Sequence, residues 1–125
     1  MRENRQKYKL ISKNMNDLIA LMDLSGKITY ASPSNQTFLG YPSSSFVGQT
    51  LLKFVHLHDI AIVMEAIKKL LRDREEMRIV TRLLHMDGHD VYTEIMMSFQ
   101  GQRHNEYADS ILIAAHDVKQ RMEKI

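Results

Sequence analysis

The chain contains no cysteine among its 125 residues. This absence excludes disulfide bonds, thiolate metal sites and cysteine nucleophiles, and it is compatible with a reducing compartment. No apolar run is long enough to cross a bilayer. The first nine residues carry five charges and no apolar segment follows them, so a signal peptide is not indicated. We therefore expect a cytoplasmic domain, which can belong to a larger, membrane-associated parent protein.

The usual arrangements of catalytic residues are also missing. There is no glycine-rich phosphate loop, no nucleophile beside a base and no clear pair of carboxylates. Asp87 and Glu94 suggest acid–base chemistry, but one falls in a predicted turn and the other on the polar face of a predicted strand. An isomerase or hydrolase on a cup-shaped fold is thus the weaker alternative, and we expect no enzyme activity from this chain alone.

Charge and composition describe an ordinary folded domain. The formal net charge is only +2, and basic residues form no dense stripe, so we expect no nucleic-acid partner. Hydrophobic residues make up 44% and charged residues 26% of the chain, which is typical of a globular fold. The length predicts one domain with a core of its own.

Hydrophobic periodicity predicts the order of the secondary structure. Alternating apolar residues indicate strands, and apolar residues spaced three and four apart indicate helices. The pattern predicts an α+β domain in which one five-stranded antiparallel sheet carries short helices and one longer helix on one face. The predicted strands cover residues 18–22, 28–30, 77–85, 91–99 and 110–116, and the predicted helices cover residues 2–15, 33–39, 43–48, 50–54 and 60–72.

Local signals mark where these elements begin and turn. Ser32 precedes Pro33 and is predicted to be a helix N-cap, and Asp59 has the same position before the longest helix. Asp87 and Gly88 are typical of a two-residue hairpin turn.

Five short motifs follow one another along the chain: Asp23-x-x-Gly26-x-Ile28-x-Tyr30, Gly40-Tyr41 followed by Gly48, the segment from Val55 to Asp59, Arg82 followed by Asp87-Gly88, and Asp117-Val118. In this order they resemble the PAS family of sensory domains. The likeness extends from about Tyr8 to Met122. Three positions depart from the family pattern, since Leu57 replaces a proline, Lys119 replaces a threonine and Tyr92 replaces a tryptophan.

The resemblance implies a pocket between the sheet and the longest helix, suited to a small apolar ligand. The alternative is that the same side chains simply fill the core, which is the default for apolar residues at these spacings. Nine methionines favour an adaptable interior. The predicted pocket walls are Phe38, Leu39, Phe54, Met64, Ile67, Ile95 and Met97.

The sequence does not identify a cofactor, but it excludes or disfavours several classes of cofactor. Without cysteine, neither a covalent flavin adduct nor a thioester-linked chromophore can form. The PAS resemblance implies that haem would bind a histidine on the longest helix, and residues 60–72 contain none, so haem is disfavoured. We interpret His56 and His58 as loop or cap residues. Noncovalent flavin has no positive signature. For a polar effector the inward-pointing candidates are Arg82, Tyr92 and Ser98, with a solvated sheet face as the alternative.

A metal site is not expected from the sequence. A zinc site needs three or four ligands at suitable spacing. His56 and His58 form one pair and His85 and His89 another, and we interpret all four as ordinary histidines.

The two ends of the chain predict a link to other parts of a signalling protein. Val118, Met122 and Ile125 have coiled-coil spacing, and Asp117 can cap the helix that they would form. We expect signal relay through Asp117, Val118 and Met122 and a homodimer held by the helical ends. The alternative is a terminal helix that packs back on its own domain. The predicted division is an N-terminal helix at 1–15, a PAS domain at 16–118 and a linker or signalling helix from 119 to 125.

The PAS resemblance implies a regulatory sensor of a bacterial signalling protein. In this family the C-terminal effector is most often a histidine kinase of a two-component or phosphorelay pathway. A ligand or partner would favour one sheet–helix arrangement and so bias the effector. The alternative is a ligand-free dimerisation or interaction module in a cyclic-dinucleotide enzyme or a transcriptional regulator.

Overall fold

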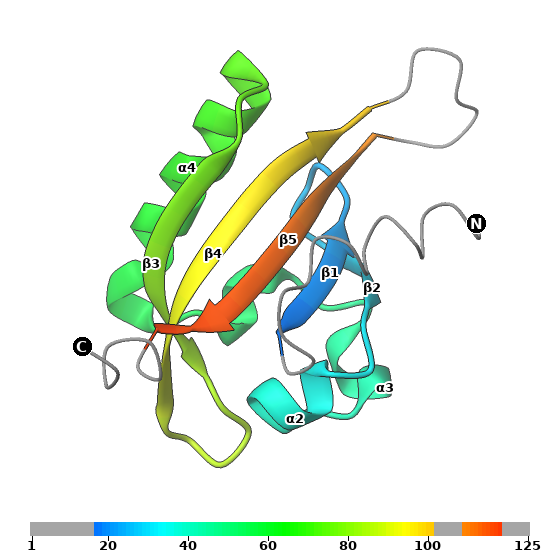
Figure 1. Ribbon diagram of the computed structural model, residues 1–125, viewed down its shortest axis with the longest axis vertical. Helices are drawn as coiled ribbons and strands as arrows, with labels where there is room; N and C mark the ends of the chain where they lie inside the picture. Colours follow the sequence, from blue (N-terminus) through cyan, green and yellow to red (C-terminus); the bar gives the residue numbers. More distant parts are fainter. Residues whose placement is uncertain (1–16, 102–108, 119–125) are drawn as a thin grey trace.

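Five strands pair into one sheet, as the alternation of apolar residues in the sequence predicts (Figure 1). The computed structural model describes residues 17–101 and 109–118. Within this part, neighbouring strands pair in the order β2-β1-β5-β4-β3 and every pairing is antiparallel. The strands are β1 (Leu18–Met22), β2 (Ile28–Ala31), β3 (Met77–Leu84), β4 (Asp90–Gln100) and β5 (Ser110–Asp117).

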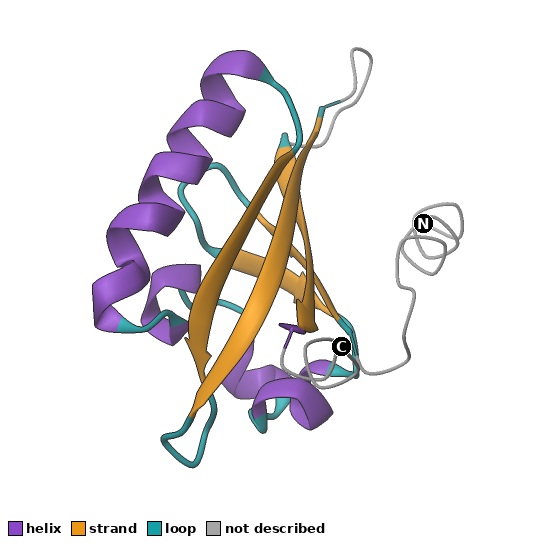
Figure 2. Ribbon diagram, turned by 60° about the vertical axis from the view of Figure 1, so that its left-hand side comes forward, coloured by secondary structure: helices purple, strands orange, loops and turns teal. Residues whose placement is uncertain are grey.

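The helices are inserted between β2 and β3, and α4 lies along one face of the sheet (Figure 2). The short helices contribute Leu39, Phe46 and Phe54 to the same core cluster as the inner face of the sheet. The α+β class and the single longer helix are therefore confirmed. The helical elements are α2 (Asn35–Leu39), α3 (Ser43–Phe46), η1 (Leu51–Phe54), η2 (Leu57–Asp59) and α4 (Ile60–Asp73).

The strand register brings apolar residues into rows on the inner face of the sheet. Ile79 of β3 pairs with Ile95 of β4, which pairs with Ala115 of β5. Met77 and Met97 form the next row. Because residues that pair across antiparallel strands project from the same face, these rows form a continuous apolar surface. The predicted alternation along β3 and β4 is confirmed.

The prediction that Met64 of α4 lines the interior is wrong. Val63, Ala66 and Leu70 are buried, as their spacing of three and four residues requires. Met64 is 44% exposed because successive helical residues are about 100° apart around the axis, which turns it away from the sheet. Met64 therefore does not line the interior.

The hairpins β1–β2 and β3–β4 share one turn design. In the second, His85 N–H donates to His89 O at 2.9 Å and Gly88 N–H donates to His85 O at 2.9 Å. Gly88 has a φ of 101°, which favours glycine. The loop therefore contains three residues, a type I turn closed by a left-handed glycine, and the predicted two-residue turn is wrong.

The predicted cap at Ser32 is also wrong. Helix α2 begins after Ser34, and neither serine makes a side-chain cap bond to the helix. The Ser32 Oγ instead accepts a hydrogen bond from Ile19 N–H at 3.1 Å, which joins the end of β2 to β1. A short hydroxyl side chain can bond a neighbouring strand as readily as a helix terminus.

The two predicted terminal segments, 1–15 and 119–125, lie outside the described residues. No helix in the described part is both long and apolar enough to span a membrane.

Gly40 ends α2 with a φ of 86° and packs directly against the β3–β4 hairpin. A Cβ atom at this position would lie 2.8 Å from Cε1 of His85 and 3.2 Å from Cβ of Met86. Gly48 has a similar φ of 95°, but a Cβ atom there would meet nothing within 4 Å.

We expect Gly40→Ala to destabilise the fold by about 2–3 kcal/mol and Gly48→Ala by about 1 kcal/mol. Both variants incur left-handed strain, and only Gly40→Ala also displaces the hairpin. The measurement is the urea midpoint at constant m-value. Equal losses in the two variants would contradict a tight contact between α2 and the hairpin.

Candidate functional site

The interior between the sheet and α4 contains six of the seven residues predicted as pocket walls. Leu39, Phe54, Ile95 and Met97 are at most 2% exposed. Phe38 and Ile67 are partly buried and pack against the same core cluster. The structure therefore brings the predicted residues together, with Met64 as the exception described above.

An aromatic cluster that the sequence analysis did not identify belongs to the same core. The ring centroids of Phe46 and Phe54 are 4.6 Å apart, and those of Tyr41 and Phe54 are 4.8 Å apart. Phe46 is fully buried. Its position at the end of a helix of only four residues gives no periodic pattern, and this is why sequence reasoning missed it.

One polar atom stands out on the inner face of the sheet. Thr81 is 2% exposed, and its Oγ1 is the single buried side-chain polar atom in the described part of the chain that has no hydrogen-bond partner. Its strand partner Thr93 is fully buried too, but the Thr93 Oγ1 donates to Val91 O at 2.8 Å. An unpaired buried hydroxyl costs free energy, so it marks a position where a ligand atom would be stabilising.

The row that contains Thr81 leads to the end of the last strand. Thr81 of β3 pairs with Thr93 of β4, and Thr93 pairs with Asp117 of β5. Val118 follows directly and is 6% exposed. Two of the three predicted relay residues therefore lie at the end of this row, and Met122 lies outside the described residues.

The three residues nominated for an inward polar site do not face the interior. Alternation along β3 and β4 places Arg82, Tyr92 and Ser98 on the outer face, opposite the buried Thr81 and Met97. Tyr92 is 51% exposed. The guanidinium of Arg82 is engaged by Asp59 rather than by the interior.

Asp59 joins the start of α4 to the edge strand β3. One carboxylate oxygen accepts Arg82 N–H at 2.7 Å and Arg82 Nε–H at 3.0 Å, and the other accepts the Nη2 donor of Arg82 at 2.8 Å. His56 N–H donates to Arg82 O at 2.9 Å beside it. Asp59 occupies the predicted position before α4, but its side chain makes no cap bond to the helix. The predicted capping role is wrong, because the carboxylate is used by Arg82.

The pairing with Arg82 changes the acidity of Asp59. The hydrogen bond from the Arg82 side chain lowers the pKa of Asp59 from 3.8 to about 2, against the opposing effect of burial. A charge-assisted, bidentate contact of this kind stabilises the ionised carboxylate. The carboxylate is therefore charged throughout the physiological pH range.

We expect Asp59→Asn to lower the free energy of unfolding by about 2 kcal/mol, less than for a fully buried pair because the Arg82 side chain is 28% exposed. The matched control is Asp73→Asn, which breaks the exposed pair with Arg72. That control should leave the urea midpoint nearly unchanged. Similar midpoint shifts in the two variants would contradict a special role for the Asp59–Arg82 pair.

The stabilisation from Asp59 should depend on pH in a defined direction. Because the folded-state pKa is depressed from 3.8 to about 2, the stabilisation is complete above the unfolded-state pKa and is lost as the pH falls toward about 2. The difference in unfolding free energy between the native chain and Asp59→Asn should therefore shrink between about pH 5 and pH 2. Other acidic groups titrate in both proteins and cancel in this difference. A difference that does not change with pH would show that charge pairing is not its cause.

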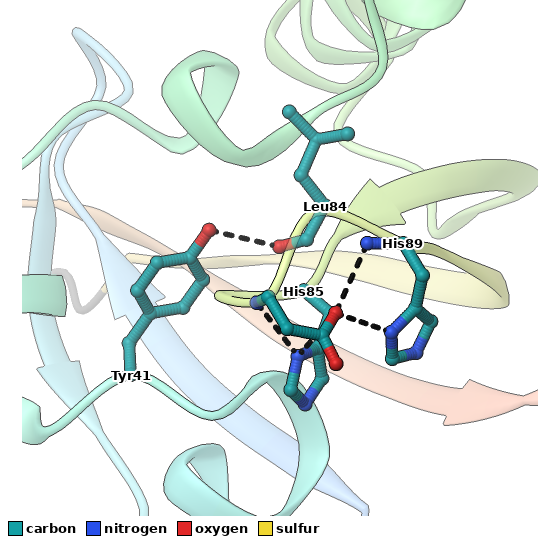
Figure 3. A network of polar contacts seen from close by, with 5 residues as sticks. Tyr41, Leu84, His85 and His89 are labelled. Carbon is teal, nitrogen blue, oxygen red and sulfur yellow. Dashed lines mark hydrogen bonds and ion pairs between the residues drawn. The ribbon is translucent and has the colours of Figure 1, made fainter.

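Two histidine pairs lie outside the interior. His56 Nδ1 accepts a hydrogen bond from His58 N–H at 3.0 Å, so His56 has the predicted cap role. The second pair, His85 and His89, flanks the β3–β4 turn (Figure 3), and Oδ1 of Asp87 lies near the Nδ1 atom of each ring. His85, Asp87 and His89 each offer one ligand atom, and these atoms all lie within 4.8 Å of one another. The sequence analysis paired the histidines but overlooked Asp87, although the His-x-Asp-x-His spacing was visible.

The strand order and the inserted helices together define an α+β fold in which helices cover one face of an antiparallel sheet. The family profile described as PAS fold matches residues 6–118. The chain therefore belongs to the PAS family, as the sequence motifs predict. No curated protein sequence matches the chain significantly.

Solved structures with the same fold come from three different organisms. A PAS domain from Colwellia psychrerythraea is 19% identical, with a TM-score of 0.77 and coverage of 96% of this chain and 98% of that one. The PAS-B domain of Drosophila melanogaster Cycle with bound ethylene glycol is 18% identical, with a TM-score of 0.73 and coverage of 80% and 98%. A PAS domain of an HTR-like protein from Haloarcula marismortui is 20% identical, with a TM-score of 0.68 and coverage of 93% of each chain. At these identities the likeness supports the fold.

Proposed function

We propose that this PAS domain is the sensory segment of a signalling protein and that it passes a ligand-dependent change to a histidine kinase in a two-component pathway. The observation that carries the proposal is the unpaired hydroxyl of Thr81 inside the apolar interior. In this role the chain regulates its effector and catalyses no reaction of its own.

The dense packing of the interior favours a small ligand. Leu39, Phe54, Ile95 and Met97 belong to one cluster and are almost fully buried, which leaves little room for a large ring system. Met97 and its strand partner Met77 have flexible side chains that can repack around a guest. A small molecule with one hydrogen-bonding group and an apolar remainder matches this combination of surfaces. The Drosophila Cycle structure carries ethylene glycol, which is also a small molecule with a hydroxyl group.

The strand register supports a route from such a ligand to an effector. A ligand atom that bonds to Thr81 would lie in the same row of the sheet as Thr93 and Asp117. Asp117 is the last residue of β5, so a change in this row acts where the chain leaves the sheet. The ligand would favour one of two sheet arrangements, and the effector would respond to the shift in population. The proposed relay residues are Asp117, Val118 and Met122.

A second candidate function is ligand-free dimerisation. On the outer face of the sheet, Val80 is 57% exposed and Tyr92 is 51% exposed. Tyr92 pairs with Arg82, which is two residues after Val80 on β3, so the two exposed side chains are diagonal neighbours. Exposed apolar and aromatic side chains of this kind are typical of protein interfaces. In this alternative the interior is only a core, and the domain holds two copies of a regulator together.

Two isosteric variants test whether the Thr81 hydroxyl is unsatisfied. Thr81→Val removes an unpaired polar atom and should raise the free energy of unfolding by about 1 kcal/mol, whereas Thr93→Val removes a hydrogen bond and should lower it by about 1 kcal/mol. The effects should be measured by urea denaturation of ligand-free protein. A loss of stability in Thr81→Val would show that its hydroxyl is already paired.

Native mass spectrometry of the chain purified from cells tests the proposed ligand. We expect an additional mass under gentle conditions that is lost on denaturation, with reduced occupancy in Thr81→Val and native occupancy in Tyr92→Ser. A clean apo mass, or unchanged occupancy in Thr81→Val, would overturn ligand sensing at this position. A dimer that persists without ligand and is lost in Tyr92→Ser would favour the interaction module.

A further inference from the structure

The β3–β4 hairpin gathers two imidazoles around one carboxylate. Oδ1 of Asp87 lies 3.1 Å from Nδ1 of His85 and 2.5 Å from Nδ1 of His89 (Figure 3). The two imidazole rings are stacked, with centroids 4.4 Å apart and an interplanar angle of 19°. All three ligand atoms therefore lie on one side of a three-residue loop.

The turn itself creates this arrangement. Gly88 adopts a φ of 101°, and the bond from His85 N–H to His89 O returns the chain so that residues four apart face each other. The same Oδ1 atom of Asp87 accepts His89 N–H at 3.0 Å, which holds the carboxylate near the Nδ1 atoms of both rings. The convergence thus follows from the hydrogen-bonded geometry of the hairpin.

The ligand atoms have suitable chemistry for a transition metal. His85 Nδ1 accepts a hydrogen bond from Asp87 N–H at 3.1 Å, so in that contact its lone pair is unprotonated and directed into the loop. Asp87 has no lysine or arginine within ion-pair distance among the described residues, and its carboxylate contacts only the two imidazoles. A divalent cation would satisfy this carboxylate and both imidazoles together.

The distances are close to those that a shared ion requires. Nitrogen and oxygen ligands bind Zn²⁺ at about 2.0–2.2 Å, so two ligand atoms on one ion lie about 3–3.5 Å apart. The three atoms here are all within 4.8 Å of one another. The His89 side chain is 58% exposed and can adjust, whereas His85 is 23% exposed and is held against Gly40.

We propose that His85, Asp87 and His89 form a binding site for a divalent transition-metal ion of the Zn²⁺ class, with the remaining coordination positions open to water or a partner's ligand. Two imidazoles and one carboxylate favour such ions over Mg²⁺ or Ca²⁺, which prefer oxygen ligands. Binding displaces the Asp87 N–H from His85 and releases a proton from His89 when its Nδ1 carries one.

The site also lies against the helical side of the fold. Met86 N–H donates to Leu39 O at 2.8 Å, and the Tyr41 hydroxyl donates to Leu84 O at 3.0 Å. A bound ion would therefore stiffen a loop that contacts the end of α2. This places the metal site outside the interior that contains Thr81, so each site can be tested without disturbing the other.

The test is calorimetric titration of the tag-free, chelator-treated chain with Zn²⁺, using Mg²⁺ as the control ion. We expect one Zn²⁺ per chain and no heat from Mg²⁺. His89→Gln and Asp87→Asn should each weaken Zn²⁺ binding by at least about tenfold, since even second-shell changes cost this much. Asp87→Asn keeps the acceptor for His89 N–H, so the loop should still form. His58→Gln, in the histidine pair that lacks this carboxylate geometry, is the matched control and should bind as the native chain does.

Proton NMR of the imidazole rings gives a second readout that does not depend on variants. On addition of Zn²⁺ the signals of His85 and His89 should shift, and those of His56 and His58 should not. Absence of Zn²⁺ binding, equal binding in His89→Gln, or shifts confined to other histidines would each overturn the proposal.

Discussion

The contact between Asp59 and Arg82 is the constraint on which the arrangement of helix and sheet depends. Residues 55–59 run along the free edge of β3, where Val55 bridges to Leu83 and His56 bonds to the backbone of Arg82. The Asp59 carboxylate then bonds the N–H and the guanidinium of Arg82. Because α4 begins at the next residue, this contact sets where the helix starts over the inner face. A carboxylate that is almost buried requires such a partner, so the charge also specifies a single arrangement.

The interior that results combines a well-packed core with one unsatisfied hydroxyl. Strand pairing fixes the positions of core residues such as Ile95 and Met97, and their burial supplies most of the stabilisation. Thr81 adds no stability through hydrogen bonding, yet it lies one residue before Arg82 and in the row that ends at Asp117. The same short segment of β3 therefore contacts the start of the long helix and leads to the exit of the sheet. A small change there would affect both, which is a useful property in a sensor.

The β3–β4 hairpin is a second place where local geometry has a distant effect. Its backbone bonds to the end of α2 through Met86, and His85 packs against Gly40. The first hairpin has the same turn, with Gly26 N–H donating to Asp23 O, but it contains no histidine. Identical turns thus carry different chemistry, because the turn conformation depends on a glycine while the side chains around it are free to vary.

Sequence alone determined the elements and their faces. Alternation predicts which residues of β3 point inward, because side chains on a strand must alternate whatever it packs against. The five motifs, taken in order, were sufficient to indicate the PAS family. The inward role of Met64 was predicted wrongly because a broad apolar stripe on a helix does not reveal its centre until the helix is docked.

Only the tertiary structure decided what the polar residues do. Asp59 has the position of a cap, yet its partner Arg82 is 23 residues away and reaches it only after β3 has joined the sheet. The unpaired state of Thr81 and its row with Asp117 depend on strand register, which no local pattern reports. The approach of His85, Asp87 and His89 depends on a three-residue turn rather than the predicted two. Periodicity is a property of single elements, whereas these contacts depend on how separate elements or turns meet in space.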